Sequence, residues 1–223
     1  MKHLIIGNGE VGKAIHAIIG GKALDRDDKY DGTCGVMHVC FPYSDKFKEI
    51  VVAYRLRYRP ALIIVHSTVP VGTCKDLGVV HSPIRGVHPH LEEGIRTMVK
   101  YFGGQNAELA AKLFKEKGLE VKVIERADET EAGKLWSTTQ YGVSIDLNKE
   151  IHKWCEDNNV DFETVYNDFN QTYNEGYLKL GRPEVARPIL KYMDGNIGGH
   201  CVLPNCKILK SDSTKKLKEK YAV

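Results

Sequence analysis

Three glycines near the start of the chain have the spacing of a phosphate-binding turn. A short apolar run, residues 4–6, leads into Gly7, Gly9 and Gly12, and residues 11–19 then carry apolar side chains at helical spacing. The first glycine of such a turn permits a tight bend, the second lets the backbone approach a pyrophosphate, and the third lets the helix pack close to the strand. The free N–H groups and the positive dipole end of that helix face the phosphates. The pattern predicts a dinucleotide site, and a glycine turn without nucleotide is the alternative; the site would comprise Gly7, Asn8, Gly9, Glu10, Val11 and Gly12.

An acidic residue stands where the adenosine ribose of such a cofactor would lie. Residues 22–25, Lys-Ala-Leu-Asp, are expected to form a short second strand that ends in Asp25, about twenty residues after the first glycine. A carboxylate there accepts hydrogen bonds from the ribose hydroxyls and repels a 2′-phosphate, which favours NAD over NADP. Arg26, the next residue, keeps the NADP alternative open because an arginine accommodates that phosphate.

Two further apolar runs end in residues that suit the nicotinamide end of the cofactor. The run 35–40 is followed by Phe41-Pro42, and the run 61–66 is followed by Ser67-Thr68-Val69-Pro70-Val71-Gly72-Thr73. Ligands of an open α/β sheet bind beyond the carboxyl ends of its strands. Pro42, Ser67 and Thr68 are therefore expected to border the cofactor.

A motif near the end of the chain completes a family resemblance. Residues 196–205 read Asn-Ile-Gly-Gly-His-Cys-Val-Leu-Pro-Asn. Together with residues 67–73 and the glycine turn, this motif resembles the nucleotide-sugar dehydrogenases that oxidise UDP-glucose or UDP-N-acetylmannosamine. More broadly, the chain resembles the 6-phosphogluconate and 3-hydroxyisobutyrate dehydrogenase superfamily. The resemblance covers essentially the whole chain, but the third domain of the nucleotide-sugar enzymes, which binds the nucleotide of the substrate, has no counterpart here.

The resemblance implies two catalytic residues. Cys201 matches the cysteine that attacks the intermediate aldehyde, so that a second hydride transfer gives a thioester; an inert buried cysteine is the alternative. A protonated His200 would favour the thiolate, and Gly199 would let the backbone approach the substrate. Lys134 matches a lysine at the start of the long helix between the family's domains, where it stabilises an alkoxide or acts as a base; a plain surface lysine is the alternative. Thr138, four residues further on, stands in place of the family's asparagine.

Other positions depart from the family pattern. Ile84 and His88 stand where the family has two glutamates implicated in proton transfer, and Asn205 replaces an aspartate and cannot act as a base. These losses disfavour a four-electron oxidation, which stays open beside a two-electron dehydrogenase that uses Lys134. A dinucleotide-binding protein without catalysis is the alternative. His88 also begins the run His-Pro-His-Leu-Glu-Glu. Three interpretations of this run stay open: His88 is an acid/base group, the run binds a metal, or it is a polar loop. We expect no metal; the expected substrate contacts are Thr138, His88, Gly199, His200 and Asn205.

The pattern of apolar residues predicts an α/β protein. Short apolar runs alternate with amphipathic stretches up to residue 125, which is typical of a doubly wound parallel sheet of Rossmann type. A smaller, mainly helical domain is expected over 126–223. The expected strands are 4–6, 22–25, 35–40, 61–66, 78–80, 98–102 and 121–124, and the expected helices are 11–19, 44–58, 107–117, 130–158 and 162–173. Gly133 and Gly142 weaken the long helix.

Composition narrows the environment and the partners. A net charge of +3 gives no support for nucleic-acid binding beyond a basic tail at 210–220, and no apolar run is long enough to span a membrane. Six scattered cysteines without a secretion signal favour reduced thiols and a cytoplasmic location. On the long helix, Trp136, Tyr141, Ile145 and Trp154 are more apolar surface than a small domain covers, which favours a homodimer.

Overall fold

The computed structural model describes residues 1–86, 89–197 and 201–221. The chain forms two compact units, 1–135 and 136–223, and the boundary between them falls within the helix α6 (Ala127–Asn158). Each unit has its own hydrophobic core.

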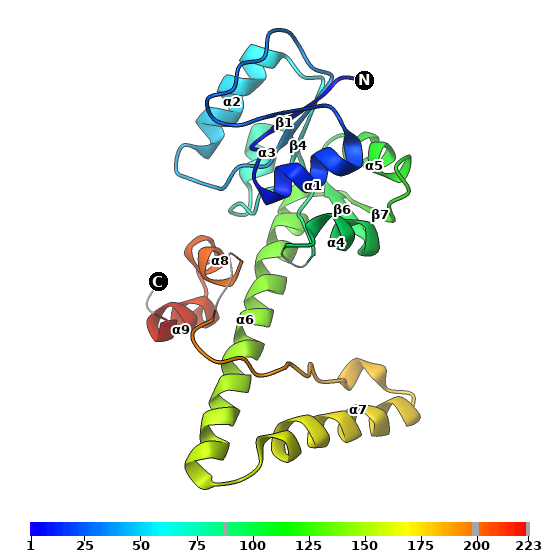
Figure 1. The fold of residues 1–223 in the computed structure, drawn as a ribbon. Helices are drawn as coiled ribbons and strands as arrows, with labels where there is room; N and C mark the ends of the chain where they lie inside the picture. Colours follow the sequence, from blue (N-terminus) through cyan, green and yellow to red (C-terminus); the bar gives the residue numbers. More distant parts are fainter. Residues whose placement is uncertain (87–88, 198–200, 222–223) are drawn as a thin grey trace. The chain divides into compact units, whose positions relative to one another are not determined.

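A seven-stranded sheet forms the centre of the first unit (Figure 1). The strand order is β2-β1-β3-β4-β5-β6-β7, and every neighbouring pair is parallel except β5 and β6, which meet antiparallel at His81 and Gly103. The expected parallel sheet is therefore confirmed, with this one antiparallel pair as an addition that the sequence did not predict. The strands are β1 (His3–Ile6), β2 (Lys22–Leu24), β3 (Val36–Val39), β4 (Leu62–Val65), β5 (Val80–His81), β6 (Lys100–Gly103) and β7 (Val121–Ile124).

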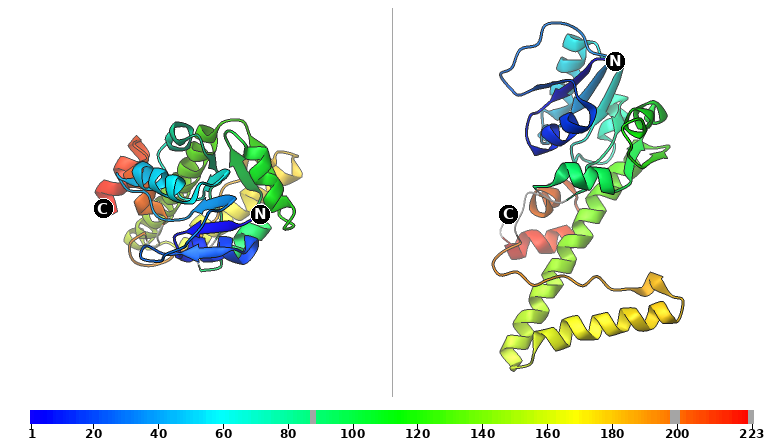
Figure 2. Two further views of the ribbon diagram at one scale, coloured as in Figure 1. Left: turned by 90° about the horizontal axis from the view of Figure 1, so that it is seen from above. Right: turned by 45° about the vertical axis from the view of Figure 1, so that its right-hand side comes forward.

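Helices cover both faces of this sheet, as the views in Figure 2 show. Successive strand residues point to opposite faces, so Val36 joins the core cluster on one face whereas Met37 and Val39 join the cluster on the other. The first cluster includes residues of α1 (Glu10–Ile19), α4 (Leu91–Thr97) and α5 (Ala107–Lys115). The second cluster includes residues of α2 (Phe47–Tyr58) and α3 (Thr73–Leu77). The α/β doubly wound architecture is confirmed.

Short elements account for most differences from the sequence-based expectations. Helices α3 and α4 were not predicted because five and seven residues are too few for a helical period to show. The expected strand 78–80 is shifted to β5, since Gly78 closes α3 in a left-handed conformation. The expected helix 162–173 is a π-helical turn, Glu163–Asp168, that continues into α7 (Phe169–Lys179).

The second unit is helical. The part of α6 after residue 135 packs against α8 (Val202–Ile208) and α9 (Asp212–Tyr221) around a small core that includes Val202 and Leu217. Gly142 lets these helices approach, because a Cβ built there would lie 2.6 Å from Val202 Cγ1. Despite Gly133 and Gly142, α6 is continuous over its whole length. The described residues of this unit contain no β-strand.

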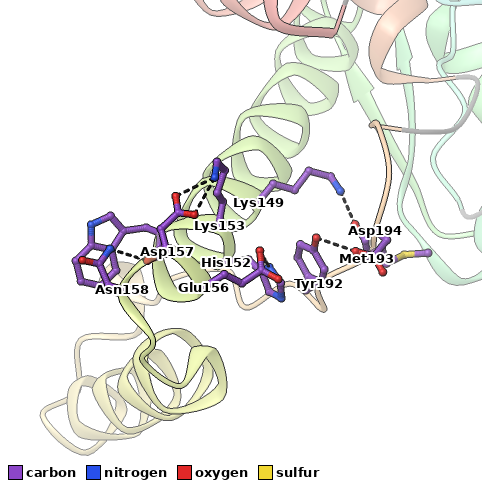
Figure 3. A network of polar contacts seen from close by, with 10 residues as sticks. Lys149, His152, Lys153, Glu156, Asp157, Asn158, Tyr192, Met193 and Asp194 are labelled. Carbon is purple, nitrogen blue, oxygen red and sulfur yellow. Dashed lines mark hydrogen bonds and ion pairs between the residues drawn. The ribbon is translucent and has the colours of Figure 1, made fainter.

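Residues after α7 return along the far end of α6 (Figure 3). After a 3₁₀ turn at Pro183–Val185, the chain brings Tyr192 onto His152, with the ring centroids 3.5 Å apart and the planes inclined by 4°. Lys149 donates hydrogen bonds to the carbonyls of Met193 and Gly195. These contacts hold the returning segment on α6. Within the described ranges, no helix is both long and apolar enough to cross a bilayer.

Candidate functional site

The glycine turn lies where the winding of the sheet reverses. From β1 the chain goes first to β2 on one side and then to β3 on the other, so the carboxyl ends of β1 and β3 flank a topological switch point. Gly7 follows β1 with a φ of 98°, and its N–H donates to Leu24 O at 2.8 Å. A Cβ at Gly7 would lie 2.9 Å from the backbone nitrogen of Phe41, which follows β3. Open α/β sheets bind their ligands at this place.

Gly9 and Gly12 differ in what surrounds them. A Cβ at Gly12 would lie 1.8 Å from Gly7 O, so this glycine is required for α1 to pack against the turn. Apart from Gly9 itself and its two chain neighbours, no atom of the described chain lies within 4 Å of a Cβ built at Gly9, which is exposed. Gly9 therefore has open space beside it at the amino end of α1, as a turn that receives a phosphate requires.

Asp25 lies directly after β2 and is exposed. Its Oδ1 accepts a hydrogen bond from the Arg26 N–H at 2.9 Å, and its own N–H donates to Asp28 Oδ2 at 2.8 Å. These bonds fix a tight turn at the end of β2. The carboxylates of Asp25 and Asp28 and the guanidinium of Arg26 all belong to this turn, so both the NAD and the NADP determinants are present.

Side chains at the ends of β3 and β4 hold these two loops together. The buried Ser67 hydroxyl donates to Phe41 O at 2.6 Å, which links the loop after β4 to the loop after β3. Pro42 is exposed and Thr68 is half-buried at the same carboxyl edge of the sheet. The structure thus brings together all the cofactor residues that the sequence predicts, on the ends of β1, β2, β3 and β4 and the start of α1.

Glu131, which the sequence analysis missed, anchors the loop after β4. Its buried carboxylate accepts hydrogen bonds from the N–H groups of Gly72 at 2.6 Å and Cys74 at 2.8 Å, at the start of α3. Burial raises the pKa of Glu131, whereas the hydrogen bonds from Cys74 and Gly72 lower it. A glutamate 57 residues from Cys74 in sequence gives no local signal of this contact.

His81 links the same loop to α6. Its Nε2 lies 3.3 Å from Ser67 O, and its Nδ1 lies 2.9 Å from Thr130 Oγ1. The Ser67 carbonyl only accepts, and the single proton of the Thr130 hydroxyl is donated to Ala127 O at 2.8 Å. Burial lowers the pKa of His81 to about 3, and the Lys134 ammonium contributes to the lowering. Lys134, half-buried and one turn after Thr130, thus lies close enough to the buried polar groups of this unit to act on them.

The remaining predicted residues belong to the second unit or lie outside the described residues. Cys201 is exposed and immediately precedes α8, whereas the other five cysteines are buried. Asn205 is only 2% exposed and donates to Thr139 Oγ1 at 2.9 Å, so its amide supports the packing of α8 on α6. Thr138 is also buried. His88, Gly199 and His200 lie outside the described residues.

Metal-binding side chains do not cluster in the described part of the chain. There, no group of three or more histidines, cysteines, aspartates or glutamates has a geometry that could hold an ion. His90, from the run that begins at His88, is exposed and precedes α4.

Comparison with known proteins identifies the fold. No family model and no curated protein matches the sequence. Among solved structures, UDP-D-ManNAc dehydrogenase from Pyrococcus horikoshii matches 100% of this chain and 68% of its own length, with a TM-score of 0.76 and 16% identity. 3-Hydroxyisobutyrate dehydrogenase from Mycobacterium tuberculosis matches 99% of this chain and 92% of its own, with a TM-score of 0.71 and 13% identity.

A third structure, the UDP-N-acetyl-mannosamine dehydrogenase from Staphylococcus aureus, covers 100% of this chain and 68% of its own, with a TM-score of 0.66 and 18% identity. The chain has a Rossmann-like dehydrogenase fold. The likeness to nucleotide-sugar dehydrogenases that the motifs indicate is confirmed at the level of structure, and so is the wider likeness to the 3-hydroxyacid dehydrogenases. A further similar structure, that of Psf3 in complex with NADP+ and 2-OPP, covers 99% of this chain and 93% of its own, with a TM-score of 0.60 and 11% identity.

Proposed function

We propose that the protein is an NAD-dependent oxidoreductase that acts on an alcohol or aldehyde group of a sugar-like or hydroxy-acid substrate. The observation that carries the proposal is the glycine turn at the switch point of the sheet. Gly7 and Gly12 are packed against backbone, Gly9 alone of the three has open space, and Asp25 stands at the end of the neighbouring strand. This combination suits a pyrophosphate and an adenosine ribose.

Different residues of the chain would bind the cofactor and act on the substrate. The backbone from Gly7 to Gly12 would hold the pyrophosphate, Asp25 the ribose hydroxyls, and the loops at Pro42 and at Ser67 and Thr68 the nicotinamide end. When bound, NAD supplies the hydride acceptor. Lys134 would take the proton of the substrate hydroxyl as a neutral amine, or would stabilise the alkoxide that forms as an ammonium. Thr138 would donate a hydrogen bond to the same oxygen.

Cys201 decides between a two-electron and a four-electron reaction. The exposed Cys201 thiol would add to a substrate aldehyde, and transfer of the hydride of that adduct to a second NAD would leave a thioester that water hydrolyses to the acid. The four-electron route needs carboxylates for proton transfer, and Ile84, His88 and Asn205 stand at the matching positions. Ile84 is buried and apolar. We therefore favour the two-electron reaction.

The substrate proposal rests on the similar structures. Two of the three reported above are named for UDP-linked sugars and one for 3-hydroxyisobutyrate, and the chain spans about two thirds of the former and nearly all of the latter. We therefore propose a hydroxy acid or a sugar derivative as the substrate. Thr138, His88, Gly199 and His200 remain the proposed substrate contacts, whereas the buried amide of Asn205 is used in packing against Thr139.

A binding protein without catalysis is the second candidate. The absence of the family's glutamates and aspartate favours it, because the fold and the glycine turn can persist after acid/base groups are lost. Under this alternative NAD binds, but no alcohol is oxidised.

The yield of NADH per substrate tests these alternatives. Across a panel of alcohols, aldehydes, hydroxy acids and sugar nucleotides, we expect one NADH per alcohol. Lys134→Ala should lower the rate by about 10²–10⁴-fold, as loss of an acid/base group does, whereas Cys201→Ser should change it little. Lys122→Ala, at an exposed strand position, is the matched control.

Two NADH per alcohol, with Cys201→Ser stopping after the first, would show the four-electron route. NAD binding with no turnover by any version would support the non-catalytic alternative.

A further inference from the structure

Three histidines form a continuous row across the sheet of the first unit. His3 of β1, His38 of β3 and His66, which follows β4, are joined nitrogen to nitrogen: His3 Nδ1 lies 3.1 Å from His38 Nε2, and His38 Nδ1 lies 3.1 Å from His66 Nε2. The ring planes of His38 and His66 are inclined by only 8°. His38 and His66 are buried, whereas His3 is half-exposed, so the row connects solvent with the interior.

The inner end of the row meets a buried lysine. His66 Nδ1 lies 2.9 Å from Ser82 O and 3.5 Å from Lys100 Nζ. Lys100 is 3% exposed, and its amine also donates to Ser82 O at 3.0 Å and Pro83 O at 3.3 Å. Within the described residues, no carboxylate forms an ion pair with it. A lysine that is fully buried without a counter-charge is costly in its charged form.

The hydrogen bonds of the row are satisfied in two ways. In the first, His66 Nδ1–H donates to Ser82 O, so His66 Nε2 accepts from His38 Nδ1–H, and His38 Nε2 accepts from His3 Nδ1–H. In the second, each imidazole carries its proton on Nε2 instead. His66 Nδ1 then accepts from Lys100, whose ammonium has three donors for three acceptors: Ser82 O, Pro83 O and His66 Nδ1.

We propose that this row conducts a proton between solvent and Lys100, and that Lys100 thereby changes charge reversibly inside the folded protein. A proton from solvent binds His3 Nε2. The Nδ1 proton of His3 passes to His38 Nε2, that of His38 passes to His66 Nε2, and that of His66 passes to Lys100 Nζ. Each imidazole gains one proton and loses one, so all three are neutral before and after, and the amine becomes an ammonium.

The surroundings of the row suit this exchange. Burial lowers the pKa of Lys100 to about 7, Cys40 opposes the lowering, and Lys134 adds to it. Burial and the charge of His3 and Lys100 lower the pKa of His38 to about 3, so an imidazolium is disfavoured there. The other facing groups are His81 beside His66, and the N-terminal amine and Lys117 beside His3. The aromatic rings of Phe102 and Phe114 lie beside the Lys100 amine, with each ring centroid 5.5 Å from Nζ.

The charge of Lys100 would act on the end of β5. Ser82 and Pro83 follow this strand, and both carbonyls accept hydrogen bonds from the amine. Protonation adds a third donor and strengthens these bonds, because hydrogen bonds from a charged donor are the stronger ones. At lower pH, Ser82 O would therefore lose the His66 Nδ1–H as a donor and keep the charged Lys100 ammonium, whose bonds to Ser82 O and Pro83 O would be stronger. This inference does not depend on the proposed oxidoreductase activity.

Nitrogen NMR of labelled histidine and lysine tests the proposal on the unmodified protein. Across neutral pH, His38 is expected to move its proton from Nδ1 to Nε2 as the pH falls, with the same midpoint as protonation of Lys100 Nζ. His38→Gln identifies the signals by their loss. A His38 that keeps one tautomer while Lys100 titrates, or that becomes an imidazolium, would overturn the proposal.

Two variants separate the row from its end point. With Lys100→Met, His38 should keep the Nδ1–H form throughout, whereas Lys122→Met, an exposed lysine on the neighbouring strand β7, should keep the wild-type switch. With His3→Gln at the half-exposed end, exchange of the Lys100 proton with solvent should slow by about tenfold or more, because an amide does not relay protons. Unchanged exchange in His3→Gln would also contradict the row as the path.

Discussion

Buried polar residues of the first unit lie mainly at the carboxyl edge of the sheet. Glu131, His81 and Ser67 connect the loop after β4 with α3, α6 and the loop after β3. Each contact joins residues far apart in sequence, so each is satisfied only in the folded state. Hydrogen bonds thus hold in place the edge where we propose cofactor binding. Because some of the buried side chains that form them titrate, the free energy of unfolding depends on pH.

The first prediction concerns acid stability. The pKa of His81 and of His38 is lowered by burial to about 3, from an ordinary value of 6.5. Between these values the unfolded chain binds protons that the folded protein does not, so the free energy of unfolding is full above about pH 6.5 and falls as the pH drops toward 3. Each such histidine contributes a slope of about 1.4 kcal/mol per pH unit.

Urea denaturation followed by circular dichroism at several pH values measures this slope. His81→Gln should reduce the slope by about 1.4 kcal/mol per pH unit, the contribution of one proton. His16→Gln, at an exposed position of α1, should leave the slope as in the wild type. An equal slope in the wild type and His81→Gln would show that His81 is not buried in its neutral form.

At the scale of elements, α6 carries the groups that organise both units. Its first turns supply Thr130 and Glu131 to the sheet edge, and Gly142 lets α8 and α9 approach its later part. The two glycines of this helix have different surroundings. A Cβ at Gly142 would lie 2.6 Å from Val202 and 3.2 Å from Leu217, whereas one at Gly133 would have nothing within 4 Å.

The second prediction follows from that difference. Gly142→Ala should destabilise the second unit by about 1–3 kcal/mol, as overpacking does. Gly133→Ala should stabilise the protein by about 0.5–1 kcal/mol, because alanine restricts the unfolded chain and favours the helix. Urea unfolding of both variants is the measurement. A stabilising Gly142→Ala would mean that the helices do not pack there as described.

The sequence predicted those elements whose pattern is local. The glycine turn, all seven strands within a few residues, and the long helices were foreseen from apolar spacing, and so was the grouping of Gly7, Asp25, Pro42 and Ser67 at strand ends. The antiparallel β6, the contacts of Glu131 and the histidine row were not foreseen. They depend on which strands become neighbours, and nothing in the spacing of His3, His38, His66 and Lys100 reveals that order.

At the scale of the whole molecule, an apolar stripe on α6 suggests self-association. Trp136, Val143, Leu147 and Trp154 are seven, four and seven residues apart, which places them on one side of a helix. All four are at least 40% exposed. Tyr141 is exposed as well. Ile145, which the sequence analysis assigned to this surface, instead packs on the core of the second unit. We propose that a second copy of the chain covers the stripe.

Light scattering at micromolar concentration is the corresponding measurement, with an expected mass of twice 25.1 kDa. Replacing Trp136 and Trp154 together by lysine should give the monomer mass, because two charges would be buried in the interface. Leu56→Lys, at a highly exposed position of α2, is the control that should remain dimeric. A wild-type protein of 25.1 kDa would contradict the proposal.

Calorimetric titration with NAD and NADP tests the central claim most directly. We expect NAD to bind at least tenfold more tightly, a difference of about 1.4 kcal/mol, because Asp25 favours free ribose hydroxyls. Gly9→Val should abolish binding by filling the open space beside the turn, whereas Gly176→Ala, at an equally open position of α7, should bind as the wild type does. Equal affinity or a preference for NADP would mean that Arg26 governs the pocket, and failure of the wild type to bind either dinucleotide would contradict the account.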